Sequence, residues 1–142
     1  MKKIILLIAI VLYVTQLQAQ KIIKANVPAE VKAAFHKAYP SIIDVKWSKD
    51  GKNFEAEYDA NKVDMSNTYS ADGTLIETEM EITASDLPKE VLEYLKNNYS
   101  GDKIKEASKI TDSKGIVTFE AEVKGMDLIF NDIGNFIKSV KK

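Results

Sequence analysis

The sequence predicts an α+β fold in which two tandem α-β(4) units form an antiparallel sheet with the helices packed on one face. Three observations support this prediction. A sequence pattern occurs twice, the hydrophobic period changes from about 3.6 to 2 within each copy, and the predicted strands are apolar on one side only. One-sided strands are typical of an antiparallel sheet whose second face is open to water.

The chain begins with a segment typical of export signals. Two lysines precede an uninterrupted apolar run at 4–14, and a short polar stretch then ends at Ala19. This run is about half as long as a membrane-spanning helix, which needs roughly 20 residues. We therefore expect a signal peptide at 1–19, cleaved near Ala19, and a short N-terminal segment at 20–25. The mature protein is expected to be periplasmic or extracellular, with no membrane anchor.

Composition excludes several classes of function. The chain has 142 residues with 20 Lys+Arg against 21 Asp+Glu, so no general attraction to nucleic acid is expected. Loss of the two signal-segment lysines leaves 18 basic against 21 acidic groups, a net charge of −3. Cysteine is absent, which excludes disulfides, thiolate metal sites and cysteine nucleophiles.

The repeated pattern spans almost the whole mature chain. Val-Pro-Ala-Glu-Val at 27–31 recurs as Leu-Pro-Lys-Glu-Val at 87–91, and Phe-Glu-Ala-Glu at 54–57 recurs at 119–122. Agreement in both order and spacing indicates duplicated architecture.

Each copy closes on an aromatic residue, a turn glycine and a short apolar stretch. These closing patterns lie at 69–76 and at 130–137. We therefore predict a first repeat at 26–83 and a second at 84–142, packed together as one compact domain.

The first repeat opens with a predicted helix. Pro28 is expected in its first turn, with Asn26 or Val27 as the boundary residue, and Pro40 is expected to stop it. The apolar residues that fall on one stripe of this helix are Val27, Val31, Phe35, Ala38 and Tyr39.

The second repeat opens with an equivalent helix. Asp86 is expected to be its N-cap, and Ser100-Gly101 is expected to end it. The apolar stripe comprises Leu87, Val91, Leu95 and Tyr99.

Alternating polar and apolar residues after each helix indicate four strands per repeat. The expected ranges are 43–48, 54–59, 63–69 and 76–82 in the first copy, and 103–110, 116–124, 126–131 and 135–140 in the second. Alternation is weakest at 103–110. Trp47 shares its parity with Ile43 and Val45, which favours the core side of the strand. The alternative places Trp47 at a partner interface together with Tyr58 and Tyr69.

Taken together, these motifs resemble the PepSY-like family. More narrowly, the chain is similar to exported two-repeat proteins of Bacteroidota described as putative beta-lactamase-inhibitor-like. The resemblance implies a continuous curved sheet with two helices, a periplasmic or extracellular location, and a role in binding or inhibiting other proteins. It implies no catalytic residues. The second copy departs from the pattern, because it lacks an equivalent of Trp47 and has Ile133 before its turn glycine.

The candidate partner-binding face is the outward, acidic side of the strands. Alternate residues of a strand share a face and lie about 7 Å apart, so carboxylates at this spacing form rows. The candidate residues are Glu55, Glu57, Glu77, Glu79, Glu120 and Glu122, with Ile129 as an apolar point among them. Such a face would attract a basic protein of the envelope or exterior.

Other uses of these residues carry less weight. Paired carboxylates occur in glycosidases, but alternate positions on a solvated face are also where any protein places charge. The acidic residues considered as calcium ligands are Asp59, Asp64, Glu77, Glu79 and Glu81, although their spacing matches no known calcium loop. His36, the one histidine, lies off the apolar stripe and is expected to be a surface residue.

The sequence therefore predicts an exported, non-enzymatic binding protein that uses its open sheet face. Inhibition or modulation of a periplasmic or secreted enzyme, such as a peptidase, is the narrower hypothesis. The alternative is an envelope protein that binds a small ligand or a cation. A hydrolase that uses carboxylates is the third class considered. No cofactor, metal or catalytic residue is predicted.

Overall fold

The computed structural model describes residues 20–21 and 26–141, so the predicted signal peptide at 1–19 lies outside the described residues. The described residues include two α-helices, the 3-10 turn η2 and nine strands. In chain order these are β1 (Gln20–Lys21), α1 (Ala29–Ala38), β2 (Lys46–Asp50), β3 (Asn53–Ala60), β4 (Val63–Tyr69), β5 (Leu75–Glu81), η2 (Ala84–Asp86), α2 (Lys89–Asn98), β6 (Ile104–Asp112), β7 (Val117–Val123), β8 (Met126–Asn131) and β9 (Phe136–Lys141).

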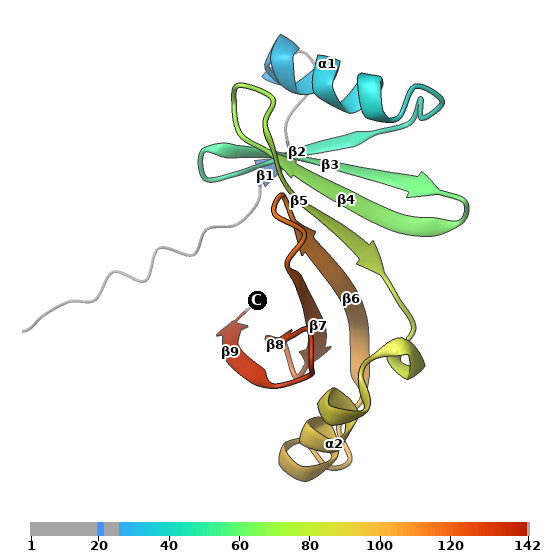
Figure 1. Ribbon diagram of the computed structural model, residues 1–142, viewed down its shortest axis with the longest axis vertical. Coiled ribbons are helices and arrows are strands. Elements are labelled where there is room, and N and C mark those ends of the chain that lie inside the picture. The colour runs from blue at the N-terminus through green and yellow to red at the C-terminus, as the bar shows by residue number, and fades with distance from the viewer. Residues whose placement is uncertain (1–19, 22–25, 142) are drawn as a thin grey trace, which may run out of the picture.

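All nine of these strands belong to one antiparallel sheet, in the order of the chain from β1 to β9. Figure 1 shows α1 beside the first strands and α2 at the opposite end of the molecule. The halves are joined through β5 and β6, where Glu79 pairs with Ile110. This arrangement confirms the predicted α+β class with an antiparallel sheet.

The two halves of the sheet share one pairing scheme. Ala56 pairs with Asn67 between β3 and β4, and Ala121 pairs with Leu128 between β7 and β8. On the other side of each central strand, the serines Ser48 and Ser108 pair with glutamates of β3 and β7. Residues at these pairing positions can therefore be matched between the two halves.

Both helices begin at a proline. Pro28 is the N-cap of α1, and its carbonyl accepts the first helical hydrogen bond, from Lys32 N–H over 3.1 Å. The predicted boundary at Asn26 or Val27 is therefore too early. Proline suits this place because its missing N–H has no intrahelical partner there. Tyr39 caps the other end, directly before Pro40, as the sequence predicts.

The N-cap predicted for the second helix is wrong. Asp86 ends the 3-10 turn η2, where Oδ2 accepts hydrogen bonds from the backbone N–H and the hydroxyl of Thr83, over 3.1 and 2.7 Å. Pro88 is the N-cap of α2 instead, matching Pro28. The carboxylate of Asp86 therefore stabilises the connection before the helix.

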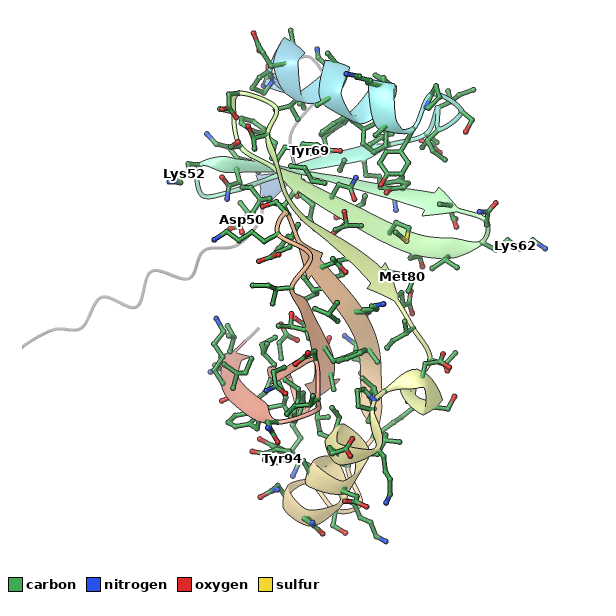
Figure 2. The ribbon with its side chains drawn as sticks, in the orientation of Figure 1. Asp50, Lys52, Lys62, Tyr69, Met80 and Tyr94 are labelled. Atoms are coloured by element: carbon green, nitrogen blue, oxygen red, sulfur yellow. The ribbon has the colours of Figure 1, made fainter. Side chains whose placement is uncertain are left out.

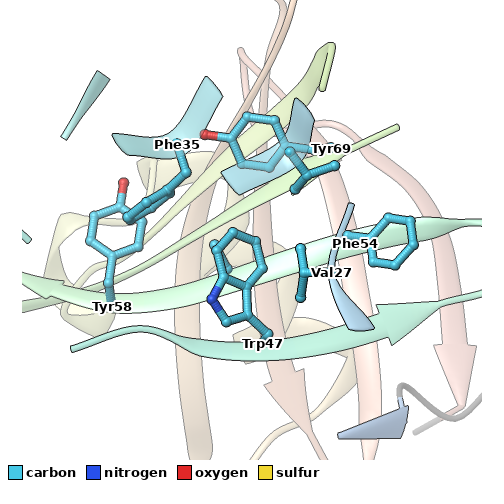
Figure 3. Packing of buried hydrophobic residues seen from close by; sticks show 8 residues of the cluster. Val27, Phe35, Trp47, Phe54, Tyr58 and Tyr69 are labelled. Carbon is cyan, nitrogen blue, oxygen red and sulfur yellow. The ribbon is translucent and has the colours of Figure 1, made fainter. Parts of the chain in front are cut away.

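The core of the first half lies between α1 and the sheet. Val31 and Phe35 of α1 are fully buried, and the Phe35 ring lies edge-on to Trp47 at 5.7 Å and to Tyr58 at 5.0 Å (Figure 3). Trp47 therefore faces the core, as its parity predicts. Ala38 is exposed, so its assignment to the apolar stripe is wrong.

The second core lies under α2. Leu128 and Phe130 of β8 are fully buried there against the α2 stripe. Tyr94 of α2 (Figure 2) extends this core towards β9. Its ring stacks on that of Phe136, with centroids 4.9 Å apart. Tyr58, Met65 and Met80 pair in one row across β3, β4 and β5. The row continues through β6 to the second core, so both helices cover the same sheet face.

Two predicted strands start or bend differently in the structure. β2 begins at Lys46, and Ile43 is 86% exposed, so the predicted core position of Ile43 is wrong. The chain between Pro40 and β2 crosses from the helix to the sheet without a strand partner. In β6 the pairing register shifts between Ile104 and Glu106, which explains the weak alternation of this segment.

The turns before β5 and β9 contact the helices. Gly73 has φ +84°, and a Cβ there would lie 2.7 Å from the carbonyl oxygen of Glu30. Gly134 has φ +83°, and its Cβ would lie 2.6 Å from Cβ of Glu90. Both positions therefore require glycine for conformation and for space.

The second turn functions without the aspartate of the first. Asp72 Oδ1 accepts from Thr74 N–H over 3.1 Å, whereas Ile133 occupies the equivalent position and is 62% exposed. Asn131 supplies the acceptor instead, because its Oδ1 binds Asn135 N–H over 2.8 Å.

Candidate functional site

The sheet face opposite the helices carries rows of acidic side chains. Glu57 pairs with Ser66, and Ser66 pairs with Glu79, so one row runs across β3, β4 and β5. In the second half, Ser108 pairs with Glu120 between β6 and β7. Paired residues of adjacent strands point to the same face, so these carboxylates share one surface.

This face contains an open hollow of about 780 Å³ that reaches from the first repeat into the second. We call it the acidic hollow, because its lining includes ten carboxylates and one lysine. The charged residues are Asp44, Lys46, Glu55, Glu57, Asp59, Asp64, Glu79, Glu81, Glu106, Glu120 and Asp127. The net charge of the lining is therefore strongly negative, although the whole chain has a charge of only −1.

Four of the seven residues predicted for the partner-binding face line the acidic hollow. These are Glu55, Glu57, Glu79 and Glu120. Glu77, Glu122 and Ile129 lie outside its lining. Glu77 is half-buried between Thr68 and Asp112, and Ile129 is half-buried opposite Glu120.

Glu122 differs most from its expected place, because only 4% of it is exposed. The Nζ of Lys105 lies 3.0 Å from its Oε1, and Lys105 is the additional residue at the register shift in β6. The bulge therefore brings a lysine over this carboxylate. Glu122 is a buried member of an ion pair rather than part of an exposed row.

Burial, hydrogen bonding and neighbouring carboxylates raise the pKa of two glutamates on this face. The pKa of Glu77 lies above its ordinary value, first because burial disfavours its charge and then because Glu79 and Glu55 lie near it. The pKa of Glu81 is also raised, first through a side-chain hydrogen bond with Asp64 and then through burial. Protonation of either carboxylate, or the approach of a positive charge, therefore removes an unfavourable interaction from the folded state.

The two halves of the acidic hollow are not equivalent. Ser48 donates a hydrogen bond from its hydroxyl to Oε2 of Glu55 over 2.9 Å, and Ser108 occupies the matching position in the second half. Lys46 pairs with Glu57, but the matching residue of the second half is Glu106. This change from lysine to glutamate makes the second half more acidic at that position.

Several lining residues were not among the predicted site residues. Asp127 shares its parity with Ile129, which was predicted to face outward, so strand alternation could have identified it. Glu106 follows the bulge in β6, and simple alternation places it on the wrong face. Asp44 lies before β2, where no strand pattern applies.

The structure also places the residues considered for other chemistry. His36 is exposed on α1, as expected, with its ring 5.6 Å from that of Phe35. Among residues 20–21 and 26–141, no group of three or more His, Asp or Glu side chains is arranged to hold a metal ion. Neither described α-helix has the length and hydropathy of a membrane span.

Comparison with protein families matches nearly the whole chain. Residues 13–77 and residues 68–138 each match the model of a family described as "Putative beta-lactamase-inhibitor-like, PepSY-like". The two matches agree with the duplicated pattern of the sequence. No curated protein matches the chain.

Several solved structures from Bacteroides share the fold. One, described as a putative periplasmic protein from Bacteroides eggerthii, has a TM-score of 0.68 at 18% identity, covering 80% of this chain and 88% of that one. A DUF2874 family protein from Bacteroides uniformis has a TM-score of 0.67 at 23% identity, with coverages of 80% and 88%. A BLIP-like protein from Bacteroides fragilis has a TM-score of 0.63 at 21% identity, with coverages of 80% and 85%.

Proposed function

The chain belongs to the PepSY-like, beta-lactamase-inhibitor-like family, and from this premise we propose that it is an exported, non-enzymatic protein that binds a basic protein surface. The acidic hollow carries this proposal, because ten carboxylates against one lysine line a helix-free face. Summed negative charge in a concave surface steers a positive partner towards it and raises the association rate.

The raised pKa values of Glu77 and Glu81 support the same function. Burial is the first cause for Glu77 and a side-chain hydrogen bond with Asp64 is the first cause for Glu81, and repulsion from neighbouring carboxylates adds to both. A lysine or arginine of the partner would relieve that repulsive part. Relief of existing repulsion adds to the attraction gained on binding. The partner's charge would therefore be worth more here than on a surface of mixed charge.

The partner belongs to the periplasm or the exterior. The sequence at 1–19 has the order of regions found in secretory signals, and a structural neighbour is described as a putative periplasmic protein. Intact-mass analysis of the protein expressed with its own leader tests this part. We expect a mature chain that begins at or near Gln20. Recovery of all 142 residues from the membrane fraction would contradict it.

Inhibition of an enzyme is the narrower form of the proposal. The family description refers to inhibitors of beta-lactamase, and we extend it to this chain only as inhibition or modulation of a periplasmic or secreted enzyme, such as a peptidase. An enzyme recovered with the protein should lose activity in its presence if this form is right.

Capture from a cell-envelope extract, followed by mass spectrometry, tests the binding function. The test variant changes four exposed carboxylates of the acidic hollow to amides. Its substitutions are Glu57→Gln, Asp59→Asn, Asp64→Asn and Glu81→Gln. The control variant makes the same change of charge at exposed positions outside the hollow. Its substitutions are Glu30→Gln, Glu90→Gln, Glu93→Gln and Asp132→Asn.

We expect the wild type and the control variant to capture the same basic protein and the test variant to lose it. Far-ultraviolet circular dichroism should confirm that both variants are folded. Equal capture by both variants would show that the carboxylates serve only solubility, and the binding surface would then lie on the loops or helices.

A further inference from the structure

The last strand, β9, is an open edge of the sheet along its whole length. In the part of the chain that the structure describes, β9 pairs with β8 alone, and all six of its residues are exposed. The opposite edge strand, β1, has only two residues. An open edge presents a row of backbone N–H and C=O groups that another chain can pair with.

The strand β5 occupies the equivalent place in the first half, and its outer edge pairs with another strand. β5 and β9 both follow a glycine turn, and both contain one extra residue just after their first pair. Tyr69 pairs with Leu75 at the start of β5, and Phe130 pairs with Phe136 at the start of β9. The outer edge of β5 is covered by β6. The edge of β9 therefore repeats the backbone pattern of an edge that holds a strand.

The hydrogen bonds of β5 identify the outward groups of β9. Ile76 accepts a hydrogen bond from Ser113 N–H over 2.8 Å, and Ile82 N–H donates to Ala107 over 2.9 Å. Positions at even spacing between them share this direction. The matching positions of β9 include Ser139, so its N–H is directed away from β8.

Side-chain charge differs between the two edges. β5 presents Glu77 and Glu79, whereas the matching residues of β9 are Lys138 and Val140. Lys141 adds a second positive charge, and β9 contains no carboxylate. Val140 is 45% exposed, so an apolar contact is also available.

We propose that the outer edge of β9 is a strand-addition site for an extended segment of a partner protein that has an acidic residue on each side of an aliphatic one. The sequence of this segment follows if the added strand pairs with β9 in the same register in which β6 pairs with β5. Asp112 pairs with Glu77, Ile110 with Glu79, and Lys109 with Met80.

On β9 the same three positions of an added strand would face Lys138, Val140 and Lys141. An acidic, an aliphatic and an acidic residue would fit them. Opposite charges and apolar pairs directly across neighbouring strands stabilise pairing, and like charges oppose it.

A second copy of the chain fits this edge poorly. Pairing of β9 with itself would bring together the lysines at 138 and 141 of both copies. Pairing with β2 of a second copy would bring Lys46 and Lys49 to the same edge. Lysines on an edge strand are a common protection against self-association. The partner segment therefore comes from another protein.

A peptide taken from β6 is the probe. Its sequence is that of Ile104–Asp112 with Lys109 replaced by glutamate, Ile-Lys-Glu-Ala-Ser-Glu-Ile-Thr-Asp. The acidic hollow should repel this acidic peptide, so binding at β9 is separable from the function proposed for the hollow. Fluorescence anisotropy with the mature chain measures affinity, and hydrogen exchange locates the site.

We expect binding that protects residues 136–141 from exchange. Lys138→Glu with Lys141→Glu should weaken it at least tenfold. Lys52→Glu with Lys62→Glu, at two hairpin tips distant from β9 (Figure 2), should leave it unchanged. Equal affinity in both double variants, or protection confined to another strand, would overturn the proposal.

Backbone pairing is tested separately from charge. Ser139→Pro removes an outward N–H from the edge, so an added strand loses a hydrogen-bond donor and binding should be abolished. The variant should still fold, because edge strands tolerate proline where the N–H faces solvent. The same peptide with N-methyl groups at alternate positions should bind to the wild type at least tenfold more weakly than the unmethylated peptide. Binding that survives N-methylation at both sets of alternate positions would overturn strand addition, even if the proline variant fails to fold.

Discussion

Asn67 donates a hydrogen bond from its side-chain nitrogen to the hydroxyl of Tyr69 over 3.0 Å, inside the core under α1. Its side-chain oxygen accepts a second bond from the hydroxyl of Tyr58 over 3.2 Å. The matching positions of the second half are the apolar Leu128 and Phe130. One core therefore contains a buried polar network where the other is packed with hydrocarbon.

The first prediction concerns this network. Asn67→Leu should lower the free energy of unfolding by about 1–3 kcal/mol, because two buried hydroxyls lose their partner. The triple variant that adds Tyr58→Phe and Tyr69→Phe should be more stable than Asn67→Leu alone, since the two hydroxyls that bound Asn67 are also removed. Burial raises the pKa of Tyr58 and of Tyr69, so both hydroxyls stay protonated in these experiments. Urea unfolding at pH 7 measures the difference. A triple variant with a lower free energy of unfolding than Asn67→Leu alone would contradict this explanation.

A second prediction separates two phenylalanines of the duplicated motif. Phe54 is buried with 8% of its surface exposed, whereas Phe119 is only half-buried. Phe54→Ala should therefore cost about 3–5 kcal/mol, and Phe119→Ala should cost less. Glu55→Gln and Glu120→Gln are the controls and should cost little. Denaturant titration measures the free energy of unfolding of the four variants. Equal small effects at all four positions would show that the strand faces are assigned wrongly.

Sequence patterns predicted the fold of this chain well because the signals are local. Helical stripes, alternation and turn glycines each depend on a few neighbouring residues, and they predicted both α-helices and the antiparallel sheet. Errors arose where two nearby residues could each fill the same role. Asp86 has the chemistry of an N-cap, but the proline two residues later starts the helix.

The candidate site was predictable in its chemistry and not in its shape. Strand parity placed Glu57 and Glu79 on the open face. A β-bulge cannot be read from parity, and it moved Glu122 under Lys105. The hollow lies on a sheet of nine strands that is strongly curved (Figure 1), and no short window of sequence encodes that curvature.

A third prediction concerns the turn glycines. Gly134 and Gly115 have nearly equal φ, +83° and +82°, but only Gly134 lies against a helix. Gly115→Ala should cost about 1–2 kcal/mol from conformation alone. Gly134→Ala should cost more, because Cβ would lie 2.6 Å from Cβ of Glu90 and 3.2 Å from the backbone nitrogen of Val91. Thermal and urea unfolding measure the loss of stability in each variant. Equal losses in Gly115→Ala and Gly134→Ala would show that the contact with α2 adds nothing.

The fourth prediction is a dependence of stability on pH. The pKa of Glu77 is raised in the folded chain above its ordinary value of 4.5, so the folded state holds this proton more tightly than the unfolded state does. The free energy of unfolding should therefore fall as pH rises from about 4.5 through the raised pKa, and Glu81 contributes in the same direction. Glu77→Gln should flatten this slope and raise stability at pH 7 by less than about 1 kcal/mol, since water screens the half-buried group. An unchanged slope in urea titrations at pH 4.5, 5.5 and 7 would contradict the assignment.

The last prediction tests whether charge in the acidic hollow sets the rate of binding. Lys46 and Glu106 occupy matching positions of the two halves, and both line the hollow. Lys46→Gln removes the one positive group of the lining, so a basic partner captured by the protein should associate a few-fold faster. Glu106→Gln should slow association by a similar factor, while dissociation changes less for both.

Salt should reduce these differences. Screening acts over about 8 Å at physiological ionic strength and about 3 Å at 1 M, so the three association rates should converge as salt is raised. Lys32→Gln, on the helix α1 at the opposite sheet face, is the matched control for Lys46 and should leave the rate unchanged. Surface plasmon resonance between 0.05 and 1 M salt measures all four proteins. If Lys46→Gln slowed association, the lysine would be a contact to an acidic group of the partner, and the partner's surface would not be uniformly basic.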